Sequence, residues 1–209
     1  MATWDTLIAR IADDLNRSDL NTQIGVAINR AIAHYQSEET WFNQTTDTVT
    51  TVATQESYGT ADGLASDIVQ IDLVQCTDSG GNQYPLTPRT WSYLRTLQSD
   101  PTGLTGLPAD WAWYQEKLYL YPTPDAAYTV TIWYIKSYAD LATGESNDWT
   151  TEHEALDLIE ARATWWVASR LLKDYERASA AKQEEGEALQ RLIIRSNRAI
   201  TRGTIRPYL

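Results

Sequence analysis

The sequence predicts an α+β protein, mainly helical, in which an antiparallel β-rich lobe is inserted into a helical bundle. Three observations support this fold class. Apolar residues recur with a helical period at both ends of the chain, and they alternate with a period of two in its middle. The length of 209 residues suits one large domain that carries an inserted lobe. We expect the bundle to comprise residues 1–42 and 149–202, the lobe residues 43–148, and an extended C-terminal tail residues 203–209.

Two amphipathic helices are predicted at the N-terminus, separated by a polar break at residues 16–21. The first apolar stripe consists of Trp4, Leu7, Ile8, Ile11 and Leu15. The second consists of Ile24, Ala27, Ile28, Ala31, Ile32 and Tyr35. The pair reads as an αα-hairpin with both stripes facing a core, because neither helix has the cationic polar face of a membrane-binding helix.

The middle of the chain is predicted to be β-rich, with strands over residues 45–54 and 67–76. The turn DSGGN predicts a hairpin between the second of these strands and residues 83–86. A short helix is expected near 88–98, with Thr87 as its N-cap and Pro88 at its first position.

A three-stranded meander is predicted next, over LPADWAWY, EKLYLYP and YTVTIWYIKSY. In the last of these strands Tyr134 and Trp133 fall on opposite faces, and both faces are apolar. We therefore expect both faces to be covered, one by the helices and the other by a neighbouring subunit.

Two helices are predicted to complete the bundle. Thr151 and Glu154 fit a capping box at the start of the first, and the second spans about 178–201. One side of this last helix carries an arginine stripe, made of Arg191, Arg195, Arg198 and Arg202. Gly203 suits the position after the helix, and Pro207 prevents the tail from continuing it.

The charge of the chain is strongly asymmetric. It has 28 acidic and 17 basic residues, a net charge of −11, yet residues 191–209 contain five arginines and no acid. The acidic remainder of the chain is poorly suited to binding nucleic acid, because that requires basic groups to neutralise phosphates. The sequence has no apolar run long enough to span a membrane and no recognisable secretory signal.

Catalytic and metal-binding residue types are scarce. The only histidines are His34 and His153, and Cys76 ends an apolar strand, where it is expected to act as a small buried hydrophobe. His153 and Asp157 have helical i, i+4 spacing, but two ligands do not make a metal site. No phosphate-binding glycine motif occurs. We therefore predict no catalytic residues, no metal and no cofactor, and a protein that is not an enzyme.

The residues LPADWAWYQEKLYLYPTPDAAYTVTIWYIKSYADL resemble the middle of phage head-to-tail adaptor (connector) proteins. The matching positions are Leu107, Pro108, Trp111, Leu118, Leu120, Pro122, Pro124, Tyr134 and Lys136. The resemblance continues through the long helix that follows and the arginine-bearing last helix. It covers residues 86–209 well and the N-terminal hairpin more loosely.

The resemblance implies a structural protein of the virion, made in the host cytoplasm. Adaptors of this kind form a homo-oligomeric ring, typically twelvefold, beneath the portal protein, and tail or nozzle proteins attach below. DNA passes through the ring without specific binding, which suits an acidic chain. No membrane is involved.

Three sets of residues are candidates for contacts in such an assembly. Aromatic residues of the meander are subunit-interface candidates: Trp111, Trp113, Trp133 and Tyr134. The tail offers anchors for docking on the portal: Ile205, Arg206, Pro207, Tyr208 and Leu209. The arginine stripe is suited to an acidic partner.

Two other functions remain open from the sequence alone. One is a tail-associated carbohydrate-binding or cell-wall-degrading protein that uses the aromatic sheet and a pair of acids, although nothing selects which acids. The other is a helical scaffold that is not viral.

Overall fold

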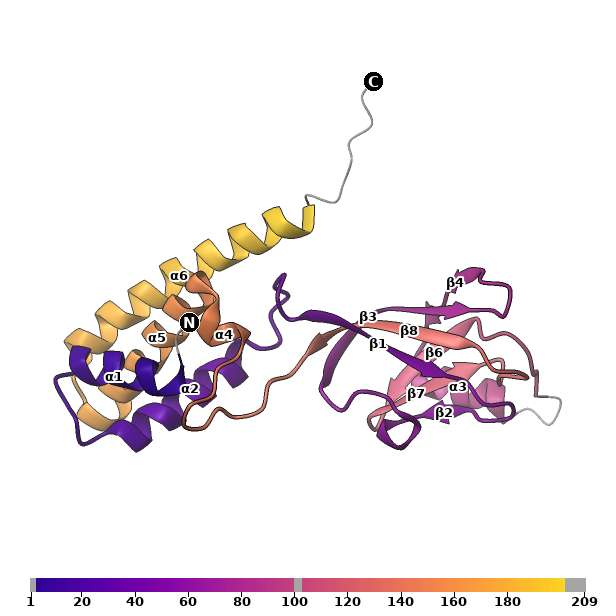
Figure 1. Ribbon diagram of the computed structural model, residues 1–209, viewed down its shortest axis with the longest axis horizontal. Coiled ribbons are helices and arrows are strands. Elements are labelled where there is room, and N and C mark those ends of the chain that lie inside the picture. The colour runs from indigo at the N-terminus through magenta and orange to yellow at the C-terminus, as the bar shows by residue number, and fades with distance from the viewer. Residues whose placement is uncertain (1–2, 100–102, 202–209) are drawn as a thin grey trace, which may run out of the picture. The chain divides into compact units, whose positions relative to one another are not determined.

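The computed structural model describes residues 3–99 and 103–201, and these contain both helices and sheets, in agreement with a mixed α and β fold (Figure 1). The chain divides into two compact units, a helical unit formed by Met1–Asn43 with Ser137–Leu209 and a β unit formed by Gln44–Lys136. The predicted lobe boundary at residue 148 is therefore too late. Tyr138 and Leu141 pack on the core of the helical unit, which draws this connecting segment into that unit.

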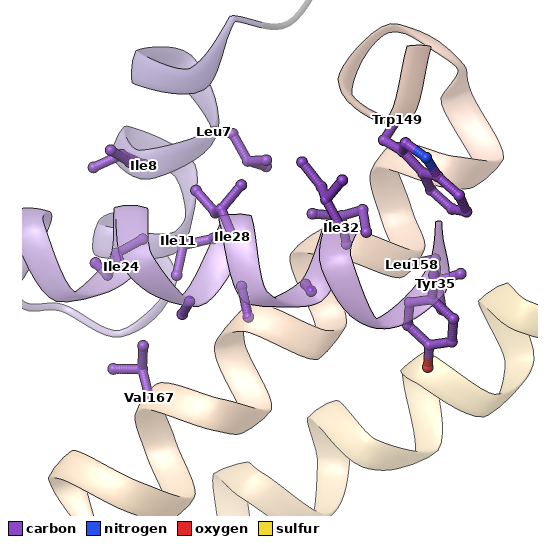
Figure 2. Packing of buried hydrophobic residues seen from close by; sticks show 14 of the residues in the cluster. Leu7, Ile8, Ile11, Ile24, Ile28, Ile32, Tyr35, Trp149, Leu158 and Val167 are labelled. Carbon is purple, nitrogen blue, oxygen red and sulfur yellow. The ribbon is translucent and has the colours of Figure 1, made fainter. Parts of the chain in front are cut away.

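The helical unit is built from two N-terminal helices and a C-terminal series. Its elements are α1 (Trp4–Asp14), α2 (Asn21–Tyr35), α4 (Asp148–Thr151), α5 (His153–Val167), the π-helical segment η2 (Ala168–Leu172) and α6 (Tyr175–Thr201). The two predicted N-terminal stripes are confirmed as core faces, because all their members except Trp4 are buried. In Figure 2, Leu7 and Ile8 of α1 lie beside Ile28 of α2, and the Tyr35 hydroxyl points toward α6.

The start of α5 differs from the prediction. Thr151 ends the short helix α4, where its hydroxyl donates to the backbone carbonyl of Asn147 at 3.1 Å. The N-cap of α5 is Glu152, which makes no side-chain capping bond. The predicted capping box of Thr151 and Glu154 is therefore wrong, because each side chain is engaged elsewhere, Glu154 with Arg195 of α6.

In the part of the β unit that the structure describes, two four-stranded sheets have the orders β1-β8-β3-β4 and β2-β7-β6-β5. The first sheet consists of β1 (Gln44–Thr50), β8 (Thr129–Lys136), β3 (Ile68–Thr77) and β4 (Gln83–Pro85), all antiparallel. The second consists of β2 (Ser57–Tyr58), β7 (Lys117–Tyr121), β6 (Asp110–Tyr114) and β5 (Thr87–Pro88), with a parallel β5–β6 pair. A short 3-10 turn, η1 (Thr60–Asp62), follows β2, and α3 (Trp91–Gln98) follows β5. One core cluster draws on both sheets, so their inner faces cover each other.

The predicted meander is wrong in its last step. The strands β6 and β7 form a hairpin, but β8 leaves them and pairs with β1 and β3 in the other sheet. Sequential strands are neighbours only as a tendency. In its observed place both backbone edges of β8 are paired, with β1 and β3, and the face that carries Ile132 and Tyr134 is covered by the second sheet.

The helix α3 begins later than predicted. Its N-cap is Thr90, whose hydroxyl accepts a hydrogen bond from the backbone N–H of Tyr93. Thr87 and Pro88 instead form β5, where the Thr87 N–H donates to Ala109 at 2.8 Å. The Thr87-Pro88 pair, which predicted the start of a helix, therefore forms a short strand instead.

Candidate interaction surfaces

The predicted aromatic interface residues fall into two groups. Trp111 is 8% exposed and Tyr134 is 4% exposed, and both belong to the core of the β unit. The Tyr134 hydroxyl donates to the Asp67 carboxylate at 2.9 Å. Both are therefore core residues, because the face of β8 that carries Tyr134 packs against the second sheet, to which Trp111 belongs, rather than facing a neighbouring subunit. Trp113 and Trp133 are only partly buried, so both remain candidates for a subunit interface.

Trp133 and Leu73 form a small apolar patch on the outer face of the first sheet. In the strand register it lies opposite Thr46 of β1 and Leu73 of β3. Leu73 is 42% exposed and directly follows a register shift in the pairing of β3 with β8. Neighbouring cross-strand side chains on one face make contact, so Trp133 and Leu73 present joint apolar surface.

A second aromatic surface lies on α3 and the β6–β7 hairpin. The Trp91 ring stacks on Tyr114, with centroids 4.2 Å apart, and meets Tyr119 edge-on at 6.3 Å. Beside it the Arg89 guanidinium lies 5.5 Å from the centroid of the exposed Tyr93 ring. Sequence patterns did not single out this cluster, because its members come from separate elements.

Part of the arginine stripe on α6 forms ion pairs with acidic residues of the same chain. Arg195 pairs with Glu154 and, at 3.6 Å, with Glu152, and Arg191 lies 3.5 Å from Asp157. These contacts join α6 to α5, so Arg191 and Arg195 are not free in the way that the stripe prediction assumed. Exposed ion pairs of this type are weak, about 1 kcal/mol or less.

The end of α6 carries other surface groups. Arg195 also lies over the Trp41 ring, 4.5 Å from its centroid. Ile193 and Ile194 are 46% and 51% exposed. Arg198 is exposed as well. Arg202 and the predicted docking residues of the tail lie outside the described residues.

An acidic cleft of about 240 Å³ lies between α1, α5 and α6. Its acids are Asp14, Asp157, Glu160, Glu184 and Glu187. Burial raises the pKa of Glu160, while the charge of Arg10, 2.7 Å away, opposes that shift. The cleft is consistent with the acidic character of the body and with repulsion of phosphate.

A buried carboxylate ties α2, α5 and α6 together. Glu185 of α6 is 3% exposed and accepts hydrogen bonds from Tyr35, from Arg162 at 2.9 Å and from Lys182 at 2.8 Å. Burial raises the pKa of this carboxyl, but the three donors outweigh burial and hold it below its ordinary value. The site is structural, because two cations and a hydroxyl fully engage the acid.

The side chains that the sequence offered for catalysis or metal binding do not come together in one site. Within residues 3–99 and 103–201, no cluster of three His, Cys, Asp or Glu side chains is arranged to hold a metal ion. His153 lies 3.7 Å from Asp157, and both contact solvent. Cys76 is fully buried, as predicted, and burial raises its thiol pKa to about 11. In the same part of the chain, no helix is long and apolar enough to cross a membrane.

Comparison with known proteins agrees with the resemblance seen in the sequence. Residues 2–207 match the family described as SU10 adaptor protein. No curated protein matches the chain. The match spans both structural units, including the β-unit segment and the α5–α6 region that carried the resemblance. The chain therefore belongs to the SU10 adaptor protein family, a family of phage adaptor proteins.

Proposed function

We propose that this protein is a head-to-tail adaptor that forms a homo-oligomeric ring beneath the portal protein of a phage and joins the capsid to the tail. The family match over residues 2–207 is the observation that carries the proposal. Tail or nozzle proteins attach below the ring, and DNA passes through it without specific binding.

The surfaces of the chain fit a ring. A closed ring of identical subunits needs two different contact faces on each subunit. The β unit offers the patch of Trp133 and Leu73 and, on other elements, the cluster of Trp91 and Tyr114. Aromatic residues are enriched at such interfaces. The net charge of −11 suits a conduit that releases DNA rather than holding it.

The first test is the mass of the purified chain, measured by size exclusion with light scattering, alone and after mixing with the portal protein of the same phage. A shift of the chain into a ring-sized complex with the portal supports the adaptor function. With an assembled portal and no shift in mass, the proposal fails, and glycan binding by the aromatic surfaces becomes the next assay.

Removal of Thr204–Leu209 tests the proposed docking tail. We expect portal attachment to weaken strongly and the thermal midpoint to stay nearly unchanged, because no apolar stripe of the predicted bundle includes this segment. Light scattering measures attachment, and circular dichroism measures the midpoint. A truncated chain that unfolds or aggregates contradicts the assignment of this segment as a docking tail.

A further inference from the structure

A basic, aromatic groove of about 250 Å³ lies between α2 and the α5–η2 segment of the helical unit. We call it the Arg–Trp groove, and its functional side chains are Arg30, His34, Arg162, Trp165, Trp166 and Arg170. No carboxylate is among the described residues that line it, although the chain contains 28 acids. The groove is therefore a local exception to the acidic surface.

Trp166 orients one of the arginines. The Arg30 guanidinium lies 5.1 Å from the Trp166 ring centroid, and the arginine is exposed while the tryptophan is partly buried. A cation–π contact restrains the guanidinium without using its N–H donors or cancelling its charge. Arg30 thus keeps its donor fork available for an anion.

The other cationic residues in and beside the groove carry more positive charge than the one nearby carboxylate can balance. Arg162 and Lys182 both lie over Trp165, and they share the single carboxylate of Glu185. Arg170, in the π-helical segment, is exposed. Among the described residues, neither Arg30 nor Arg170 has a carboxylate within ion-pair distance. Two arginines are therefore uncompensated beside half-buried indole surface.

We propose that the Arg–Trp groove binds an acidic peptide segment of a partner protein. Carboxylates of the segment pair with Arg30 and Arg170, since guanidinium groups bind carboxylates in a bidentate manner. The methylene groups of the segment pack on Trp165 and Trp166. A short peptide is favoured over DNA, because a long polyanion also meets the repulsion of a chain whose net charge is −11.

The test uses the full chain and a fluorescently labelled hexaglutamate peptide, with binding followed by anisotropy. A hexaglutamine peptide and an oligothymidylate of similar size are the comparison ligands. The groove variant is Arg30→Gln with Arg170→Gln. The control variant, Arg17→Gln with Arg198→Gln, removes the same charge from exposed arginines outside the groove.

We expect hexaglutamate to bind the native chain, and we expect the groove variant to lose at least about tenfold in affinity while the control variant stays within about twofold. Arg30→Lys with Arg170→Lys is expected to give an intermediate affinity, because lysine keeps the charge but not the fork.

Three results would overturn the inference: no binding of hexaglutamate, equal losses in the groove and control variants, or groove-dependent binding of oligothymidylate alone. This inference rests on the groove alone, and because the assay contains no portal protein, its failure is distinguishable from failure of the adaptor function, which is read from attachment to the portal.

Discussion

At the scale of single residues, Gly25 shows how closely α1 and α2 approach each other. A Cβ atom placed on Gly25 would lie 2.3 Å from Cζ2 of the Trp4 indole. Only glycine leaves room for this ring at its present position, so Trp4 packs directly on the backbone of α2.

We expect Gly25→Ala to lower the free energy of unfolding by about 1–3 kcal/mol, since overpacking displaces the indole. The matched control is Gly186→Ala in α6, where no atom lies within 4 Å of the new Cβ apart from the adjacent residues and the nearby backbone of the same helix. That change should raise stability by about 0.5–1 kcal/mol through helix propensity. Urea unfolding followed by circular dichroism measures both, and shifts of the same sign would contradict the packing described for Gly25.

Glu185 is the residue on which the polar contacts between α2, α5 and α6 converge. We expect Glu185→Gln to cost about 1–3 kcal/mol of stability at neutral pH, because Arg162 and Lys182 lose their shared carboxylate. Glu184→Gln, at an exposed neighbour, should change stability by less than about 0.5 kcal/mol.

The same carboxylate predicts a pH dependence. Its folded pKa lies below the ordinary value of 4.5, so its contribution is complete above that pH and is lost as the pH falls through the folded pKa. The difference in thermal midpoint between the native chain and Glu185→Gln should therefore shrink in acid. A difference that is constant from neutral pH to about pH 3 would show that the charge of Glu185 does not stabilise the fold.

At the scale of elements, the residue that caps the N-terminus of α3 shows which of two threonines, Thr87 or Thr90, begins that helix. Thr90 accepts from the Tyr93 N–H, whereas Thr87 lies in β5. We expect Thr90→Ala to destabilise the chain by about 1 kcal/mol and Thr87→Ala to have a smaller effect. Thermal unfolding compares the two variants, and the reverse order would restore the start of the helix that the sequence predicted.

At the scale of the whole molecule, net charge governs how copies of the chain meet. Each copy carries −11, so copies repel one another at low ionic strength. We expect self-association to strengthen as salt rises from about 50 to about 300 mM, because the screening length shortens. Binding of hexaglutamate to the Arg–Trp groove should weaken over the same range. Sedimentation velocity measures the first trend, and self-association that weakens with salt would indicate attractive charge pairs between subunits instead.

The sequence by itself determined which stretches of the chain are helical or β-rich and which faces of the two N-terminal helices are buried. Leu7, Ile11, Ile24 and Ile28 occupy the core as their spacing predicted, and Cys76 is buried at the end of its strand. The family resemblance was also carried by the sequence and agrees with the match over residues 2–207. These properties follow from local period and composition, which a linear pattern records directly.

The tertiary structure alone decided which surface covers each face. The inner face of β8 packs against the second sheet, so Tyr134 and Trp111 fill a core that they share rather than facing a neighbour. Arg195 reaches acids of α5, and Arg30 meets Trp166 across the α2–α5 groove. Periodicity shows that a face is apolar or charged, but its partner is set by contacts between segments far apart in the chain, and no local pattern contains that information.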